Sequence, residues 1–507
     1  MSRLLFLICI FTLSNAQRCV QRKFNKDSFV CVCNSTYCDF ATVLVPEKGT
    51  FRSYVSNRDN YRLDSKTGSF NNDTKGDIKL YLNPTKTYQT ISGFGSSFTD
   101  SAGLNIKLLS QATQLNLLKS LFDKEGNKYN LCRLPIGGSD FSTRPYSLDD
   151  IPGDVSLKNF SLTQEDYEYK ISFMKKALEM NPELKFMAAS WTAPPWMKTF
   201  VDFGGWYNQL REEYYQAYAE YLVKFLTEYK LQGLPIWALS TGNNPIICTT
   251  AVARKQNCML WVPYKVVNWV INNLAPSIAR SISNETIITT GDHPKLELIW
   301  YYDAMFRYNN SINKFISGLT SHWYDEEYLG HSELDRIHAT YPDKLLIMSE
   351  ACTGFQGINS PDKVVDLGSW VDAEKYIISI IENLNHWIIG WIDWNLALNK
   401  YGGPNWIDNY VNSPIITVPE SDEFYKQPMH YALAHFSKFI PRGSKRIEIN
   451  GKNEIKSVAV STPNNETVII LYNKSDRKKN VTIVDPRQGN ININIDARSI
   501  QSIIYKQ

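Results

Sequence analysis

The feature that most constrains the fold is a regular alternation of apolar, strand-like runs with amphipathic, helical runs between about residues 89 and 395. Repeated alternation of this kind over about 300 residues predicts an α/β fold, the (β/α)8 TIM barrel. Strand-like runs lie at residues 130–135, 185–191, 235–239, 285–290, 318–324, 345–350 and 387–394. Helical periodicity marks residues 167–180, 212–229, 266–281 and 371–384.

The pattern differs at the two ends of the chain. Residues 17–40 form a short, cysteine-rich segment. In residues 78–82, apolar and polar side chains alternate, which predicts a strand. From about residue 444 onward, short alternating runs at 458–460, 468–472, 481–483 and 491–495 predict a β-rich region, an all-β sandwich. The chain shows no internal repeat and no low-complexity linker.

The N-terminus has the pattern of a secretory signal peptide over residues 1–16. Arg3 is followed by an apolar run from Leu4 to Leu13 and by the small-residue sequence Ser14-Asn15-Ala16. A run of ten apolar residues is too short to span a membrane, and no later apolar run in the sequence reaches transmembrane length. We therefore expect a protein of the secretory pathway, either in the lysosomal lumen or secreted, without a transmembrane segment.

Cysteine usage agrees with an oxidising compartment. Cys19, Cys31, Cys33 and Cys38 are clustered, and their spacing lacks the paired pattern of zinc sites, so disulfides are favoured over a metal site. The spacing alone leaves three pairings open, and Cys248 and Cys258 could pair or stay free. Glycosylation sequons occur at Asn34, Asn72, Asn159, Asn284, Asn309, Asn465, Asn473 and Asn480.

Composition narrows the class of ligand. The net charge of +3 gives no electrostatic case for a nucleic acid partner. Aromatic residues make up 13% of the chain, which fits core and surface packing and also fits stacking on the apolar faces of sugars.

Glu350 is the strongest catalytic candidate, because it ends an apolar strand-like run and precedes the glycine-rich segment 353–357. A retaining glycosidase needs such a carboxylate as its nucleophile, although a lone strand-end Glu is more often solvated or salt-bridged. His322 and Tyr324 end another strand and could orient Glu350, or the His could be structural. Asp393, between Trp391 and Trp394, is a candidate partner for a sugar hydroxyl.

Longer segments carry a family resemblance. They include residues 31–38, 190–194, 349–352, 393–399 and 424–429. Over these segments, and from Cys19 almost to the C-terminus, the chain resembles the lysosomal glucosylceramidases (acid β-glucocerebrosidases), a glycoside hydrolase family of sphingolipid metabolism. Matches of this length are far more specific than a short catalytic motif.

The resemblance implies a TIM barrel at 89–395 with 428–444, and a β-sandwich at 43–88 with 445–507. It also implies a small disulfide-tied antiparallel sheet at 17–42 with 396–427, with Cys19 joined to Cys31 and Cys33 to Cys38. The implied substrate is a β-glucoside on ceramide, and the implied partners are a saposin-type activator and an anionic lipid surface. No cofactor and no metal are implied.

The resemblance also assigns roles to individual residues. Glu350 aligns with the family nucleophile, and His322 and Tyr324 align with residues around it. The implied sugar-binding positions are Asp140, Trp191, Asn243, Trp394 and Asn409, with Arg133 as an active-site arginine.

The chain departs from the family at the general acid/base. The family reads Thr-Ala-Glu-Asn-Glu-Pro where this chain reads Ser240-Thr241-Gly242-Asn243-Asn244-Pro245, so the acid/base position is Asn244. The segment 253–258 that follows is basic and polar, whereas the family is aromatic there. An amide can neither donate a proton at useful pH nor activate water. Three hypotheses follow: a glucosidase with impaired or altered activity, an inactive glucoside- or glycolipid-binding pseudoenzyme, and a structural partner of an active relative.

Overall fold

The computed structural model describes residues 18–354, 364–451 and 454–507. Two predictions from the sequence lie outside this range. The signal peptide at residues 1–16 is one of them, and most of the glycine-rich segment after Glu350, from residue 355 onward, is the other.

The central unit is a parallel eight-stranded sheet in the described part of the chain, with strand order β6-β13-β12-β11-β10-β9-β8-β7. Backbone hydrogen bonds from Asn130 to Phe94 (3.0 Å) and from Phe98 to Arg133 (2.8 Å) join the two edge strands, so the sheet closes into the predicted TIM barrel. Its strands are β6 (Gly93–Gly95), β7 (Leu131–Ile136), β8 (Lys185–Ser190), β9 (Ile236–Ser240), β10 (Ile287–Pro294), β11 (Ile316–His322), β12 (Leu345–Glu350) and β13 (Ile388–Ile392).

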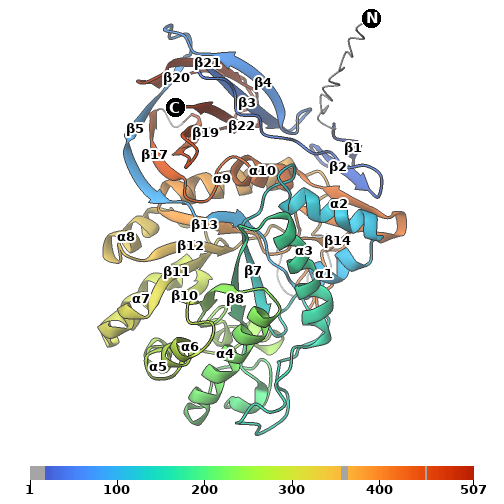
Figure 1. The fold of residues 1–507 in the computed structure, drawn as a ribbon, viewed down its shortest axis with the longest axis vertical. Coiled ribbons are helices and arrows are strands. Elements are labelled where there is room, and N and C mark those ends of the chain that lie inside the picture. Colours follow the sequence, from blue (N-terminus) through green and yellow to red (C-terminus); the bar gives the residue numbers. More distant parts are fainter. Residues whose placement is uncertain (1–17, 355–363, 452–453) are drawn as a thin grey trace, which may run out of the picture.

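Helices surround this sheet (Figure 1). They are α1 (Asp100–Lys107), α2 (Gln111–Phe122), α3 (Ser172–Met180), α4 (Tyr215–Leu231), α5 (Pro263–Trp269), α6 (Ala275–Arg280), α7 (Lys295–Tyr308), α8 (Ser332–Thr340), α9 (Trp370–Asn385) and α10 (Pro428–Ser437). The four helical segments expected from periodicity are all present. The segment expected at 266–281 is interrupted by a π-helical turn, Val270–Leu274, between α5 and α6.

One strand boundary differs from the expectation in a way that matters for function. We expected the run at 285–290 to end at residue 290, whereas β10 continues to Pro294. Residue Asp292 has a positive φ of 48°, and the pairing of β10 with β11 shifts register there. This irregularity is local backbone geometry that apolar periodicity does not report.

A nine-stranded sheet packs beside the barrel and takes its strands from both chain regions that flank it (Figure 1). Its hydrophobic core includes Leu80, Ile469 and Ile503. The strands are β3 (Thr50–Asn57), β4 (Asp64–Ser69), β5 (Ile78–Thr90), β17 (Lys445–Gly451), β18 (Lys456–Ser461), β19 (Glu466–Asn473), β20 (Lys479–Asp485), β21 (Gly489–Ile495) and β22 (Ser499–Lys506).

A small five-stranded sheet combines β1 (Gln21–Lys23) and β2 (Phe29–Asn34) with β14 (Leu398–Asn399), β15 (Ile415–Val418) and β16 (Glu423–Lys426). Disulfides join Cys19 to Cys31 and Cys33 to Cys38, which is the pairing that the resemblance implies.

A third disulfide settles the open question about Cys248 and Cys258, because these two cysteines are bonded to each other.

The glycosylation sequons differ in their exposure to solvent. Asn72, Asn159 and Asn284 are exposed and Asn34 is partly buried. At the sequon of Asn473, the side-chain amide is fully buried and donates to the carbonyl oxygens of Arg477 and Asp496.

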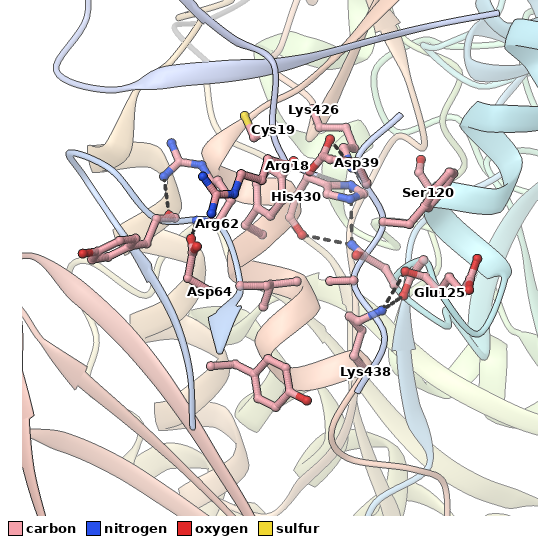
Figure 2. A pocket seen from close by; sticks show the side chains of 18 of the residues that line it. Arg18, Cys19, Asp39, Arg62, Asp64, Ser120, Glu125, Lys426, His430 and Lys438 are labelled. Atoms are coloured by element: carbon pink, nitrogen blue, oxygen red, sulfur yellow. Dashed lines mark hydrogen bonds and ion pairs between the residues drawn. The ribbon is translucent and has the colours of Figure 1, made fainter. Parts of the chain in front are cut away.

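The two β-rich sheets and the barrel meet around a cavity of about 930 Å³ (Figure 2). Lys426, at the end of β16, forms an ion pair of 2.8 Å with Asp39. Lys438, just after α10, donates to the backbone carbonyl oxygens of Glu125 (3.0 Å) and Gly126. Tyr431, on α10, donates to Asp39 Oδ2 at 2.6 Å, so a buried polar contact ties the small-sheet region to the barrel at this junction. Within the described residues, no helix is long and apolar enough to cross a bilayer.

Candidate active site

The predicted site residues converge at one end of the barrel. Parallel strands place their carboxyl ends on the same edge, where active sites of this fold form. The contacts described below join most of the predicted residues to one another. The side chains come from β7 (Arg133), the segments after β8 and β9 (Trp191, Asn243 and Asn244), β11 (His322), β12 (Glu350) and the segment after β13 (Trp394).

Glu350 is buried at the end of β12, and both of its carboxylate oxygens are engaged. Arg133 Nη1 donates to Oε2 at 2.6 Å, and the Tyr324 hydroxyl donates to Oε1 at 2.8 Å. His322 Nδ1 lies 3.8 Å from Oε1. A carboxylate fixed by two donors is oriented for nucleophilic attack rather than free in solvent.

Arg133 is completely buried and has two acidic neighbours. Burial acts to lower the pKa of its guanidinium, but Asp292 (3.6 Å from Nη2) and Glu350 raise that pKa further, so the net shift is upward. The same Nη2 donates to Asn243 Oδ1 at 2.8 Å. Arg133 therefore stays charged and connects the end of β12 to the segment after β9.

Asp292 is the second acidic neighbour of Arg133. Burial opposes its ionisation, but Arg133 and His322 outweigh that effect and hold the pKa of its carboxyl well below the usual range. Ser349 Oγ donates to Asp292 Oδ1. Asp292 is thus the buried counter-charge that keeps the guanidinium in place between two strands.

A second group of contacts joins the other predicted sugar-binding residues. Asn409 Nδ2 donates to Asp140 Oδ2 at 2.9 Å. Burial, with a smaller contribution from Glu350, raises the pKa of Asp140 to about 7. Trp191 and Trp394 stack with ring centroids 5.1 Å apart, and the Arg133 guanidinium lies 5.1 Å from the Trp191 ring centroid. Stacked indoles beside hydrogen-bonding side chains suit an apolar sugar face with polar edges.

Asn244, which the resemblance aligns with the acid/base position, lies in a neutral setting. Its Oδ1 lies 3.0 Å from His293 Nδ1, and its backbone N–H donates to the Asp292 carbonyl at 2.8 Å. Burial and the nearby His322 lower the pKa of His293 to about 3, so this imidazole is neutral across the ordinary pH range. Neither side chain of the pair supplies a proton there.

The backbone beside Asn244 has an unusual conformation at Gly242. Gly242 stands where the family has a Glu, with φ of 151°, and a Cβ there would lie 3.3 Å from Trp261 Cδ1. Few L residues adopt that conformation, so a side chain at this position is strained.

The rim beside Asn244 is built from two packed loops. The Cys248–Cys258 disulfide closes the loop after β9, and its Ala253 carbonyl accepts from Gly205 N–H at 2.7 Å. Asn257 Nδ2 donates to the Gly138 carbonyl at 3.0 Å, two residues before Asp140. Arg254 lies 5.5 Å from the ring centroid of the exposed Trp206.

Sequence reasoning missed Asp292, His293 and Ser349. Polar residues at the end of the strand-like run would have indicated the first two, had the end of β10 been placed correctly. It also misjudged Asp393, whose oxygens accept from Tyr376 (2.5 Å) and Ser96 (3.0 Å) inside the protein. Burial raises the pKa of Asp393 to about 7, and its contacts give it a structural role.

Family comparisons agree with this architecture. The glycosyl hydrolase family 30 TIM-barrel domain matches residues 91–440, and the glycosyl hydrolase family 30 beta sandwich domain matches residues 443–503. The chain therefore belongs to glycosyl hydrolase family 30.

Individual relatives place it further within that family. It is 36% identical to lysosomal acid glucosylceramidase of Mus musculus, over 97% of this chain and 96% of the mouse protein. It is 26% identical to endo-1,6-beta-D-glucanase neg1 of Aspergillus fumigatus, over 85% of this chain and 89% of the fungal protein. The crystal structure of SrfJ from Salmonella typhimurium superposes with a TM-score of 0.82 at 27% identity, covering 90% of this chain and 100% of SrfJ. The chain is a glucosylceramidase-like member of family 30.

Proposed function

We propose that this protein has a glucosylceramidase-type active site that acts on β-glucosides by the retaining mechanism. In this site Glu350 is the nucleophile, and Asn244 has replaced the general acid/base. Formation of a glucosyl-enzyme is retained, whereas hydrolysis of ordinary glucosides is impaired. The observation that carries the proposal is the double fixation of Glu350 by Arg133 and Tyr324.

Sugar recognition rests on side chains that the structure brings to the same end of the barrel. Asp140 and Asn409 form a hydrogen-bonded pair suited to adjacent sugar hydroxyls, and Asn243 is held by Arg133. Trp191 and Trp394 stack on each other, with ring centroids 5.1 Å apart, and both are buried. In this proposal these residues bind glucose, as the corresponding residues are expected to do in the family.

The loss of rate caused by Asn244 follows from the usual contribution of general acid–base catalysis. General acid–base catalysis typically contributes about 10²–10⁴-fold, equivalent to about 3–5 kcal/mol of barrier. A ceramide alkoxide is a poor leaving group, so cleavage of glucosylceramide loses most of this assistance. Hydrolysis of the glucosyl-enzyme also loses its base.

The rim supports an apolar or amphipathic aglycone. Phe200, Val201, Trp206 and Tyr207 are all exposed on the loop that packs against the disulfide loop. Such a patch fits a lipid-borne glucoside presented at an anionic lipid surface, with Arg254 near it. A saposin-type activator belongs to the same proposal through the family resemblance, and a lysosomal or secreted location agrees with the name of the mouse relative and with the signal-peptide pattern.

The test is covalent trapping with 2-deoxy-2-fluoro-β-glucosyl fluoride, followed by intact-mass measurement. One fluoroglucosyl adduct, located on Glu350 by peptide mapping, is expected. The Glu350→Gln variant is the control and should give none. An unmodified wild-type protein under conditions that label an active relative would refute the nucleophile assignment.

A second function, glucoside binding without chemistry, is favoured by the neutral Asn244–His293 pair. A glucose-type iminosugar that binds wild type and the Glu350→Gln variant, without adduct formation in the wild type, would establish the binding protein instead.

A further inference from the structure

We infer that this site transfers glucose between two anions without moving a proton. The donor is a β-glucoside or glucosyl ester whose aglycone leaves as a stable anion, such as an acidic phenolate or a carboxylate. The acceptor is a small anion, such as a carboxylate. This inference rests on the proposed role of Glu350 as nucleophile.

The first half-reaction needs only groups that the site contains. Glu350 attacks the anomeric carbon, the bond from that carbon to the aglycone oxygen breaks, and the electron pair leaves with the aglycone. The products are a glucosyl ester of Glu350 and a free phenolate or carboxylate. Arg133 and Tyr324 orient the nucleophile, and no proton changes place.

The surroundings of Asn244 exclude an ordinary acid/base role at this position. Within the described chain, its side chain has one hydrogen-bond partner, His293. Glu297 Oε2 lies 3.7 Å from His293 Nε2, the ring nitrogen that does not face Asn244. His322 and Asp292 lie 3.7 Å apart, and His322 lies 3.8 Å from Glu350. A departing alkoxide therefore meets an amide.

The second half-reaction explains why the acceptor should also be an anion. Water must lose a proton as it attacks, and the position that would accept it is an amide. An anion attacks the anomeric carbon directly, the bond to Glu350 breaks, and the electron pair returns to the Glu350 carboxylate. The amide also removes the negative charge that a Glu would place beside the incoming anion, and it is one methylene shorter.

The rim on the same side is cationic. Arg254 is exposed and lies against Trp206, on the loop that the Cys248–Cys258 disulfide closes. Asp202, on the loop that carries Trp206, accepts from the backbone N–H of Gly204. An exposed guanidinium on this loop is a pairing group for an anionic aglycone or acceptor.

The experiment compares donors and acceptors on the mature protein. The donors are 2,4-dinitrophenyl β-glucoside and octyl β-glucoside, and the acceptors are azide, formate and acetate, with chloride at equal ionic strength as the control. With the dinitrophenyl donor we expect a burst of one equivalent of phenolate, followed by a slow phase that azide accelerates about tenfold or more, within the range that base catalysis supplies. NMR should identify β-glucosyl azide, and the octyl glucoside should not react.

Each outcome decides between the two proposals. A burst without anion acceleration, or glucose as the sole product in azide, overturns the transfer inference and leaves Glu350 as nucleophile. Ready hydrolysis of the octyl glucoside overturns the inference as well. Absence of both burst and fluoroglucosyl adduct refutes the proposed function itself. Glu350→Gln should abolish every signal, and the surface variant Asn72→Gln should retain them all.

Discussion

The side-chain oxygen of Asn244, in the segment after β9, lies 3.0 Å from Nδ1 of His293 on β10. The amide at the acid/base position is thus matched by an imidazole that burial keeps neutral. Neither side chain carries a charge, so this part of the site cannot exchange a proton with a departing aglycone at ordinary pH.

Restoring the carboxylate should restore part of the missing chemistry. We expect Asn244→Glu to raise hydrolysis of octyl β-glucoside by about 10–100-fold, below the full contribution of acid–base catalysis because His293 and Gly242 remain. Residue 244 has φ of 47°, which Asn tolerates better than Glu. A loss of about 1 kcal/mol of folding stability should accompany the gain.

The matched control for this change is Asn244→Gln, which has the same length and the same backbone cost but no ionisable group. Initial rates should rise for Glu and stay at the background for Gln. Equal rates for the two variants, with intact folds by circular dichroism, would show that the pocket has diverged beyond this one position.

Tyr324 should affect the rate of glucosyl-enzyme formation. Replacing it by Phe removes the hydroxyl that donates to Glu350 Oε1 at 2.8 Å. A hydrogen bond to a charged group contributes about 1.5–3 kcal/mol, so the rate of fluoroglucosyl labelling should fall about 10–100-fold. Tyr328→Phe is the control, because Tyr328 is 86% exposed. Labelling of Tyr324→Phe at the wild-type rate would remove the hydroxyl from the mechanism.

The sequence predicts the barrel well because its strands and helices are long and periodic, and Glu350 could be found because it stands at a strand end. Arg133 lies inside β7 and is assigned only through the family resemblance. His293 could not be found from a local pattern. The strand that carries it runs four residues past the apolar stretch, through a positive φ at Asp292. Its pairing with Asn244 joins β10 to the segment after β9, which no local pattern encodes. Asp393 was predicted to contact a sugar because its carboxylate lies between two indoles in the sequence. The same sequence pattern occurs when the carboxylate accepts from a buried Tyr, as it does here from Tyr376.

Buried histidines should make folding stability fall in acid. His435 is fully buried, its two ring nitrogens contact Ser502 Oγ (2.7 Å) and Ser56 Oγ (2.9 Å), and burial lowers its pKa from 6.5 to about 3. The folded pKa lies below the unfolded one, so between these values the unfolded chain binds a proton that the folded chain excludes. The contribution of His435 is complete above the unfolded pKa and is lost as pH falls, by up to about 1.4 kcal/mol per pH unit.

The measurement is urea unfolding of wild type and His435→Gln between about pH 4 and pH 6. Gln can bond to both hydroxyls but does not titrate, so the slope of unfolding free energy against pH should decrease by about 1.4 kcal/mol per unit. Parallel slopes would contradict the assignment, whatever the absolute stability of the variant. His293 and His430 have lowered pKa values as well, so part of the acid sensitivity should remain.

The Cys248–Cys258 disulfide should matter more for the aglycone side than for the sugar side. It closes a short loop whose backbone contacts the 199–208 loop through Gly205 and Tyr207, whereas the Asp140–Asn409 and Trp191–Trp394 pairs lie outside it. The double variant Cys248→Ala with Cys258→Ala should lose about 2–3 kcal/mol of unfolding free energy. It should bind a small glucose-type iminosugar as wild type does, and an N-alkylated iminosugar with a long chain about tenfold more weakly, since about 1.4 kcal/mol of rim contact would be lost. Calorimetric titration of both ligands measures this, with Asn72→Gln as the folded control. If binding of both ligands weakened equally, the disulfide would act on the sugar site. That result would contradict the division of the site into a sugar side and an aglycone side.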